Sequence, residues 1–206
     1  MKPVHAFDPK PVTLRGAHVI LEPLAERHAA DLFEVGGDEA IWRYMPRPPL
    51  ASVSDSRELV AEALESAADG TQLPFAIVDC SSGKAVGSTR YLDIRRAHRA
   101  LEIGWTWLGT RYQRTAVNTE SKYLLLSHAF EELGAGRVQF QTDGRNVRSQ
   151  NAIVRLGATL EGVLRKDKLL WDGHVRDSVL YSVVDSEWPT VKAQLQRFMG
   201  ARTVPV

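Results

Sequence analysis

The chain has 206 residues, 44% of them hydrophobic, with 26 Lys and Arg against 25 Asp and Glu. This length suits one domain better than two, and a formal net charge of +1 argues against a protein that grips nucleic acid electrostatically. The single cysteine, Cys80, excludes a disulfide framework and a multi-cysteine metal site. Because no apolar run reaches the ~18 residues of a membrane span and the start lacks a signal-peptide pattern, we expect a cytoplasmic protein that binds no membrane.

The first half of the chain predicts four strands and two helices. Residues 1–11 hold three of the ten prolines, so we expect a loose arm there and one domain over 12–200. The short loop 81–84 is typical of a hairpin, which predicts antiparallel neighbours on either side of it. The expected strands are 12–23, 73–79, 85–94 and 100–108, and the expected helices are 25–35 and 53–68.

The second half predicts a longer helix, 119–133, because apolar residues recur there at three- and four-residue spacing before Gly134. A strand (137–142) and a helix (146–156) follow it. Asp172-Gly173 indicates a tight hairpin between two last strands, 159–171 and 174–184, and Ser186 caps a final helix. The order of elements is a mixed α/β layout, unlike the strict alternation of a dinucleotide-binding fold.

The stretch from Arg111 to Glu120 is the most informative in the sequence. It leaves a Trp-rich strand and enters the long apolar helix. Such a junction presents unpaired backbone N–H groups at the positive end of the helix dipole, which suits phosphate. Small residues, Thr115 and Ala116, leave the backbone approachable, and Arg111 and Arg114 add positive charge. From these residues alone, an ordinary helix start remains the alternative, since the loop is neither a Walker motif nor GxGxxG.

The same stretch resembles the pyrophosphate loop of the GNAT superfamily of acyl-CoA-dependent N-acetyltransferases, in its RimJ/RimL-like branch of ribosomal-protein N-terminal acetyltransferases. Glu102-Ile103-Gly104-Trp105 and the run from Asn146 to Ala158 match in order and spacing, and the likeness covers about residues 12–185. Ala116 and Asn118 depart from the pattern, which prefers glycine and a small residue there. Asn118 could instead serve as the helix N-cap.

The resemblance implies a mostly antiparallel sheet of about seven strands flanked by helices. Its fourth and fifth strands, 100–108 and 137–142, would splay apart to take the pantetheine arm of acetyl-CoA, and the N–H groups of Gln113 to Val117 would hold the pyrophosphate. No metal is implied. The implied cofactor-binding residues are Trp105, Trp107, Arg111, Gln113, Arg114, Thr115, Ala116, Val117, Asn118, Asn146 and Asn151.

Glu102 is the candidate general base for deprotonating the attacking amine. Strand alternation predicts Leu101, Ile103, Trp105 and Trp107 on one face, and Glu102 with Gly104 and Thr106 on the other. A buried ion pair with Arg90 on the neighbouring strand is the structural alternative. A strand N–H beside a bulge near 104–107 would meet the oxyanion, although a bulge cannot be read from sequence.

Ser149 is the candidate proton donor to the leaving thiolate, with a capping or solvated serine as the alternative.

The candidate acceptor-binding residues are Trp42, Tyr44, Met45 and Arg90. For the aromatic group the alternative is simple core anchoring. Arg176 and Asp177 are expected to form an ion pair, with contact to the acceptor as the alternative.

These expectations add up to an enzyme that transfers an acetyl group from acetyl-CoA to an amine by direct attack in a ternary complex. The expected acceptor is the N-terminal α-amine of a protein or peptide. The alternatives are a small-molecule amine, such as an antibiotic, polyamine or amino acid, and a non-catalytic acyl-CoA sensor. A homodimer through the C-terminal edge strands is also open.

Overall fold

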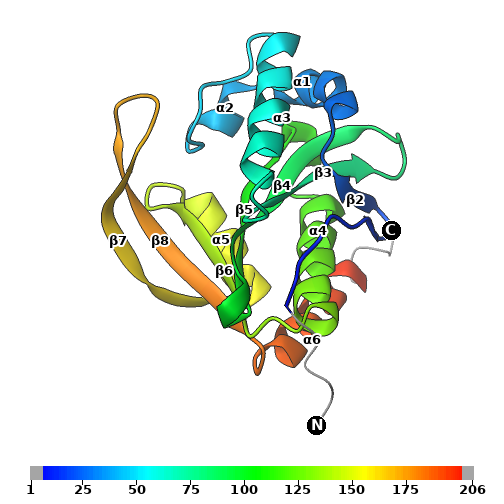
Figure 1. The fold of residues 1–206 in the computed structure, drawn as a ribbon, viewed down its shortest axis with the longest axis vertical. Helices are drawn as coiled ribbons and strands as arrows, with labels where there is room; N and C mark the ends of the chain where they lie inside the picture. The colour runs from blue at the N-terminus through cyan, green and yellow to red at the C-terminus, as the bar shows by residue number, and fades with distance from the viewer. Residues whose placement is uncertain (1–6, 201–206) are drawn as a thin grey trace.

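The computed structural model describes residues 7–200, and it forms one eight-stranded sheet in the order β1-β2-β3-β4-β5-β6-β8-β7 (Figure 1). The strands are β1 (Leu14–Arg15), β2 (Val19–Pro23), β3 (Leu73–Asp79), β4 (Ala85–Arg95), β5 (Ala100–Leu108), β6 (Arg137–Asp143), β7 (Thr159–Leu169) and β8 (Val175–Val184). Neighbouring strands are antiparallel except β5 and β6, which are parallel. The predicted mixed α/β fold with a mostly antiparallel sheet is confirmed.

Helices flank the sheet and divide the core into two clusters. The helices are α1 (Ala29–Gly36), α2 (Glu39–Trp42), α3 (Val53–Ala67), α4 (Ala116–Ser127), α5 (Val147–Leu156) and α6 (Trp188–Gly200). The larger cluster joins the sheet to α4, α5 and α6, and the smaller one joins it to α1, α2 and α3. Within residues 7–200, none of these helices is both long and apolar enough to cross a membrane.

The strand predicted over 12–23 is divided in two, which is why the sheet has eight strands rather than about seven. The chain turns between β1 and β2, and the buried Glu120 carboxylate on α4 accepts hydrogen bonds from the backbone N–H groups of Ala17, His18 and Val19 at 2.7–2.9 Å. A Cβ on Gly16 would clash with the Glu120 side chain, so this close approach requires glycine. Glu120 therefore fastens the turn to the helix.

Helix α4 begins at Ala116, three residues before the predicted start. Its N-cap is Thr115, whose hydroxyl accepts a hydrogen bond from the Val117 N–H, so Asn118 lies inside the first turn and is not the cap. The short helix α2 was not predicted. Of the expected arm, residues 1–6 lie outside the described part of the chain, while Phe7 and Pro9 are buried and thus pack against the domain.

Candidate active site

The parallel pair β5 and β6 stays together for three register pairs and then separates. The last of these pairs joins Glu102 to Gln139, and the rest of β5 has no partner on this side. Beyond this pair the strands run on separately, β5 towards α4 and β6 towards α5 (Figure 1). The predicted splay between these strands is confirmed, and it leaves the backbone of β5 beyond Glu102 able to pair with an extended ligand.

A β-bulge in β5 lies immediately beyond this point. Gly104 pairs with Arg90 and Trp107 with Ser88, so three steps along β5 match two along β4, and Trp105 adopts a φ of 48°. An extra residue in one strand reverses which face the following side chains occupy. The prediction that Trp105 and Trp107 share a face with Leu101 was therefore wrong.

Both tryptophans instead belong to the cluster beneath α1–α3, on the same side as Glu102. Thr106, expected beside Glu102, turns to the opposite side, where its hydroxyl accepts a hydrogen bond from Lys122 Nζ at 2.7 Å. Trp107 is only 4% exposed. A cofactor contact from Trp107 would therefore have to come from its backbone.

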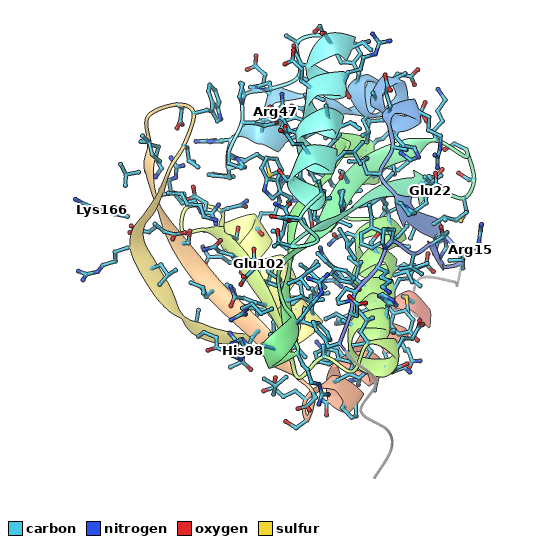
Figure 2. The ribbon with its side chains drawn as sticks, in the orientation of Figure 1. Arg15, Glu22, Arg47, His98, Glu102 and Lys166 are labelled. Carbon is cyan, nitrogen blue, oxygen red and sulfur yellow. The ribbon has the colours of Figure 1, made fainter. Side chains whose placement is uncertain are left out.

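Glu102 lies at the separation point of the strands, and only 9% of its surface is exposed (Figure 2). Its Oε2 accepts a hydrogen bond from Gln139 Nε2 at 3.1 Å. Burial raises the pKa of the Glu102 carboxyl above its usual 4.5, although Lys168 and the Gln139 hydrogen bond act in the lowering direction. A buried carboxyl with a raised pKa is a better proton acceptor for an amine than an ordinary glutamate.

The alternative role for Glu102, an ion pair with Arg90, is absent from the described residues. The Arg90 guanidinium lies instead over the Trp105 ring, 4.3 Å from its centroid. The expected pair of Arg176 and Asp177 was also wrong, because adjacent strand residues face opposite sides. Arg176 is buried, whereas Asp177 is exposed and accepts a hydrogen bond from the Lys166 N–H.

The predicted phosphate loop connects β5 to α4 through a short turn, Thr110–Tyr112, and Arg114 adopts a φ of 61°. Two of the five expected N–H donors are already bonded within the loop, from Gln113 to the Thr110 carbonyl and from Val117 to the Thr115 hydroxyl. The N–H groups of Ala116 and Asn118 have no acceptor inside the helix. They point along the positive end of the helix dipole and thus fit an anion.

Arginines surround this loop, and one of them was not predicted. Arg111 is exposed. Arg148, in the first turn of α5, donates from Nη1 to Gln113 Oε1 at 2.8 Å and so ties α5 to the loop. The sequence signal for Arg148 was its place in the first turn of the helix that follows the second splayed strand. These cations and the helix start fit the phosphates of a nucleotide-bearing cofactor.

The first half of α5 and its N-cap contain the other predicted site residues, Asn146, Ser149 and Asn151. The Asn146 side chain caps the helix by accepting from the Ser149 N–H at 3.1 Å, so Ser149 itself is not the cap. Ser149 is half-buried, and within residues 7–200 its hydroxyl has no hydrogen-bond partner. Asn151 is exposed. A hydroxyl without a partner near the strand opening is suited to donate to a ligand.

The aromatic residues expected at the acceptor divide between core and site. Trp42 is fully buried, donates from Nε1 to the Gly36 carbonyl at 2.7 Å and packs 5.0 Å from the Trp107 ring, so it is a core anchor and not an acceptor contact. Met45 and Tyr44 are half-buried. The Tyr44 ring lies 5.6 Å from the Arg145 guanidinium, which links the loop after α2 to the loop before α5.

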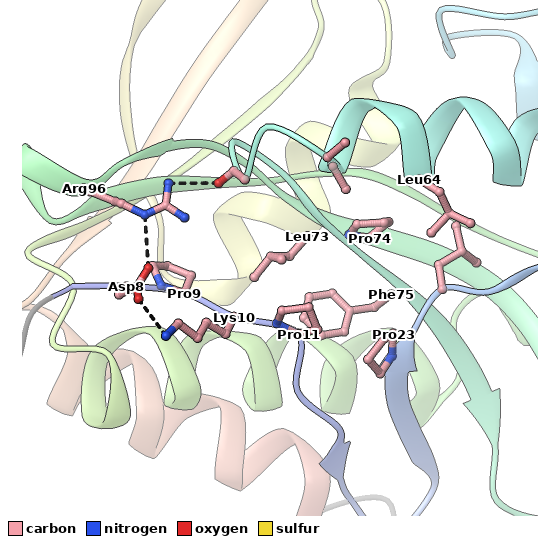
Figure 3. Close-up of a pocket in the computed structure, with 14 residues that line it drawn as sticks. Asp8, Pro9, Lys10, Pro11, Pro23, Leu64, Leu73, Pro74, Phe75 and Arg96 are labelled. Atoms are coloured by element: carbon pink, nitrogen blue, oxygen red, sulfur yellow. Dashed lines mark hydrogen bonds and ion pairs between the residues drawn. The ribbon is translucent and has the colours of Figure 1, made fainter.

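An apolar hollow of about 410 Å³ lies elsewhere, between the segment 8–11, the end of α3 and β3 (Figure 3). The Asp8–Arg96 ion pair closes one side of it. None of the predicted site residues lines it. Within residues 7–200, no group of three or more His, Cys, Asp or Glu side chains is placed to hold a metal ion.

The fold and the site together define a class: a transferase whose split parallel strand pair, helix start and arginines suit a long cofactor with phosphates. The sequence of residues 18–159 matches the family model of the acetyltransferase (GNAT) domain. The chain therefore belongs to the GNAT family of N-acetyltransferases, enzymes that use acetyl-CoA to acetylate an amine.

Solved structures and a curated relative agree with this assignment. A "GCN5-related N-acetyltransferase from Brucella melitensis" is 28% identical with a TM-score of 0.87, over 93% of this chain and 87% of that one. A "putative acetyltransferase from T. thermophilus" is 39% identical with a TM-score of 0.84, over 93% and 98%. "Putative ribosomal N-acetyltransferase YdaF" of Bacillus subtilis (strain 168) is 25% identical over 82% of this chain and 91% of its own length.

Proposed function

We propose that this enzyme acetylates the N-terminal α-amine of a protein or peptide, as a RimJ/RimL-like member of the family whose catalytic domain spans residues 12–200. Support for the branch comes from the similarity to YdaF, whose name refers to a ribosomal N-acetyltransferase. Support for the chemistry comes from one observation above the others. The buried Glu102 carboxyl lies where β5 and β6 separate, beside unpaired strand backbone.

An N-terminal α-amine and a lysine side chain differ in how easily Glu102 can deprotonate them. Near pH 7.4 roughly a fifth of an α-amine with a pKa of ~8 is already neutral, against ~0.1% of a lysine with a pKa of ~10.4. Burial raises the pKa of Glu102 above 4.5 and so brings it nearer to the pKa of either amine. This arrangement favours the less basic α-amine.

In the proposed reaction the neutral amine attacks the thioester carbonyl carbon directly, with no covalent acyl-enzyme. Glu102 takes the proton that the amine loses, directly or through one water, and the C–S bond breaks as the amide forms. The Ser149 hydroxyl donates its proton to the leaving thiolate and regains one from water, while Glu102 returns the proton of the amine to solvent. The N–H groups of Ala116 and Asn118, together with Arg111 and Arg148, hold the phosphates of acetyl-CoA, and unpaired β5 backbone aligns its pantetheine arm.

Release of CoA thiol from acetyl-CoA across a panel of acceptors tests the proposal. The panel contains peptides with varied first residues, the same peptides with a blocked α-amine, polyamines, free amino acids and aminoglycosides. We expect release with some peptides and none once the α-amine is blocked. A matched peptide with a free lysine and a blocked α-amine controls for side-chain acetylation.

Three outcomes separate the alternatives. Release that survives blocking of the α-amine overturns the N-terminal assignment. Release with small amines alone moves the acceptor to the metabolite or antibiotic class. Binding of acetyl-CoA with no release on any amine identifies a cofactor sensor and overturns catalysis.

A further inference from the structure

Arg90 is a buried cation that forms no ion pair among the described residues, and only the charge of the Glu62 carboxylate acts on it from a distance. It stands on β4 directly opposite Gly104, is 5% exposed, and covers the Trp105 ring. Its Nη1 donates to Gln72 Oε1 at 3.3 Å, and its Nε has no hydrogen-bond partner in the described chain. Desolvation lowers the pKa of Arg90 to about 10, so the side chain stays charged at neutral pH.

A second arginine, Arg47, lies on the same side of the sheet beside α3 (Figure 2). Its side chain is 11% exposed, and neither Nε nor Nη1 has a hydrogen-bond partner among residues 7–200. Glu62 Oε2 lies 3.7 Å from Nη1, but the Glu62 side chain is 63% exposed and therefore screened by water. Besides desolvation, the pKa of Arg90 is raised by the charge of the Glu62 carboxylate and lowered by the charge of the Arg47 guanidinium.

Buried charges are normally paired, yet these two guanidiniums share one exposed carboxylate, that of Glu62, and keep unused N–H donors, which leaves positive charge for a further anion to balance. Arginine offers a planar fork that matches the oxygens of a carboxylate or phosphate. The position of Arg90 relative to Glu102 indicates how far such an anion would lie from the reacting amine. Glu102 is the diagonal neighbour of Arg90 across β4 and β5, which puts their Cα atoms ~7–8 Å apart on one face.

We propose that the acceptor carries a carboxylate or phosphate group a few bonds from its reactive amine, and that Arg90 and Arg47 bind this group while Glu102 faces the amine. For a peptide this means an acidic or phosphorylated first residue. The inference rests on the proposed function and deepens it, because it names the class of acceptor. Half-buried Trp105 holds the Arg90 guanidinium over its ring, at the opening where the anion would enter.

Acceptors in matched pairs that differ only in charge test this assignment. For peptides the pairs begin with Asp or Asn, Glu or Gln, and phosphoserine or serine. For small amines they are β-alanine or its amide, and phosphoethanolamine or ethanolamine. We expect the anionic member to have the higher kcat/KM by about 10–100-fold, because a charge-assisted hydrogen bond to a buried partner is lost in the neutral one.

Three variants assign the preference to the arginines. Arg90→Gln and Arg47→Gln should each bring the ratio of kcat/KM for the anionic and the neutral acceptor towards one, while acetyl-CoA binding stays unchanged. Arg90→Lys should keep only part of the preference for the anionic acceptor. Arg27→Gln is the matched control, since Arg27 is an exposed arginine paired with Glu22. Thermal unfolding of each variant shows that it is folded.

The outcomes also separate this inference from the proposed function. If peptides are acetylated on the α-amine with no charge preference, the proposed function stands and the anion site is overturned. If only small anionic amines react, and Arg90→Gln removes their advantage, the anion site stands and the N-terminal assignment fails. If Arg90→Gln lowers kcat/KM equally for the anionic and the neutral member of a pair, the anion site is contradicted. If no acceptor is acetylated, the anion site and the proposed function are both contradicted.

Discussion

Gln139 donates from its side-chain amide to Glu102 Oε2 at 3.1 Å, across the last pair that holds β5 and β6 together. The hydrogen bond therefore stands where the backbone ladder ends, and it orients the carboxylate at the opening between the strands. The same bond favours the charged form of Glu102, while burial favours the neutral form. Burial and this hydrogen bond thus act on the pKa of the candidate base in opposite directions, alongside the charge of Lys168, and the hydrogen bond can be removed separately.

The pH profile of kcat/KM tests Glu102 directly. A base must be deprotonated to act, so the rate should rise with pH through the pKa of Glu102, which burial places above 4.5. Glu102→Gln should lower kcat about 10²–10⁴-fold and remove this acidic limb. An acidic limb that persists unchanged in the variant would show that another group is the base.

Gln139→Leu should move the acidic limb to higher pH without removing it. The substitution deletes the hydrogen bond that lowers the pKa of Glu102 and leaves the burial that raises it. The measurement is the same pH profile. Gln196→Leu, which removes an exposed side-chain contact with Tyr123, is the control and should leave the limb in place. A limb that moves to lower pH in Gln139→Leu would contradict the assignment.

Gly104→Ala should displace the base. A Cβ at this position would lie 2.9 Å from Glu102 Oε1 and 2.7 Å from Leu92 Cδ1, and both atoms are the far ends of flexible side chains. We expect the protein to fold with a loss of ~1–3 kcal/mol in the free energy of unfolding, and kcat to fall ~10–100-fold. Gly37→Ala is the control because nothing lies within 4 Å of its added Cβ. An unchanged kcat in Gly104→Ala would mean that the position of the carboxylate is not critical.

The sequence predicted the order of elements and the two splayed strands well, because apolar periodicity and glycine stops are local signals. It failed at Trp105, where one residue with a φ of 48° reverses the two faces of β5. No pattern in the run from Leu101 to Trp107 marks that residue, and the reversal depends on pairing with β4. Strand alternation therefore misassigned Trp105, Thr106 and Trp107 together.

The candidate site shows the same division between local and long-range information. The helix start near Thr115 could be expected from small polar residues, though not to the exact residue. Glu120 lies in the matched loop motif, yet its carboxylate fastens a turn that is more than a hundred residues away in the chain. The unused N–H donors of Arg47 and Arg90 become visible only when distant segments come together.

Lys122 should make the stability of the protein depend on pH. Desolvation lowers its pKa from 10.5 to about 7, so between these values the unfolded chain holds a proton that the folded chain lacks. Over that range Lys122 makes the free energy of unfolding rise with pH, with a slope approaching ~1.4 kcal/mol per pH unit. Chemical denaturation from pH 6 to 10 measures it. Lys122→Met should lose this slope, whereas a substitution at exposed Lys10 should keep it; identical slopes in both would contradict a buried neutral lysine.

Arg90→Met separates a binding role of this arginine from a structural one. A structural arginine stabilises the fold, so its removal would cost stability. Arg90 instead carries a buried charge with an unused Nε and no ion pair among the described residues. Its stacking on Trp105 and the more distant Glu62 charge return only part of the desolvation cost. We expect Arg90→Met to leave the free energy of unfolding unchanged or raise it by ~1 kcal/mol, while kcat/KM for anionic acceptors falls. A loss of more than ~2 kcal/mol in chemical denaturation would show that Arg90 holds the fold together, and that its burial serves the sheet and not the acceptor.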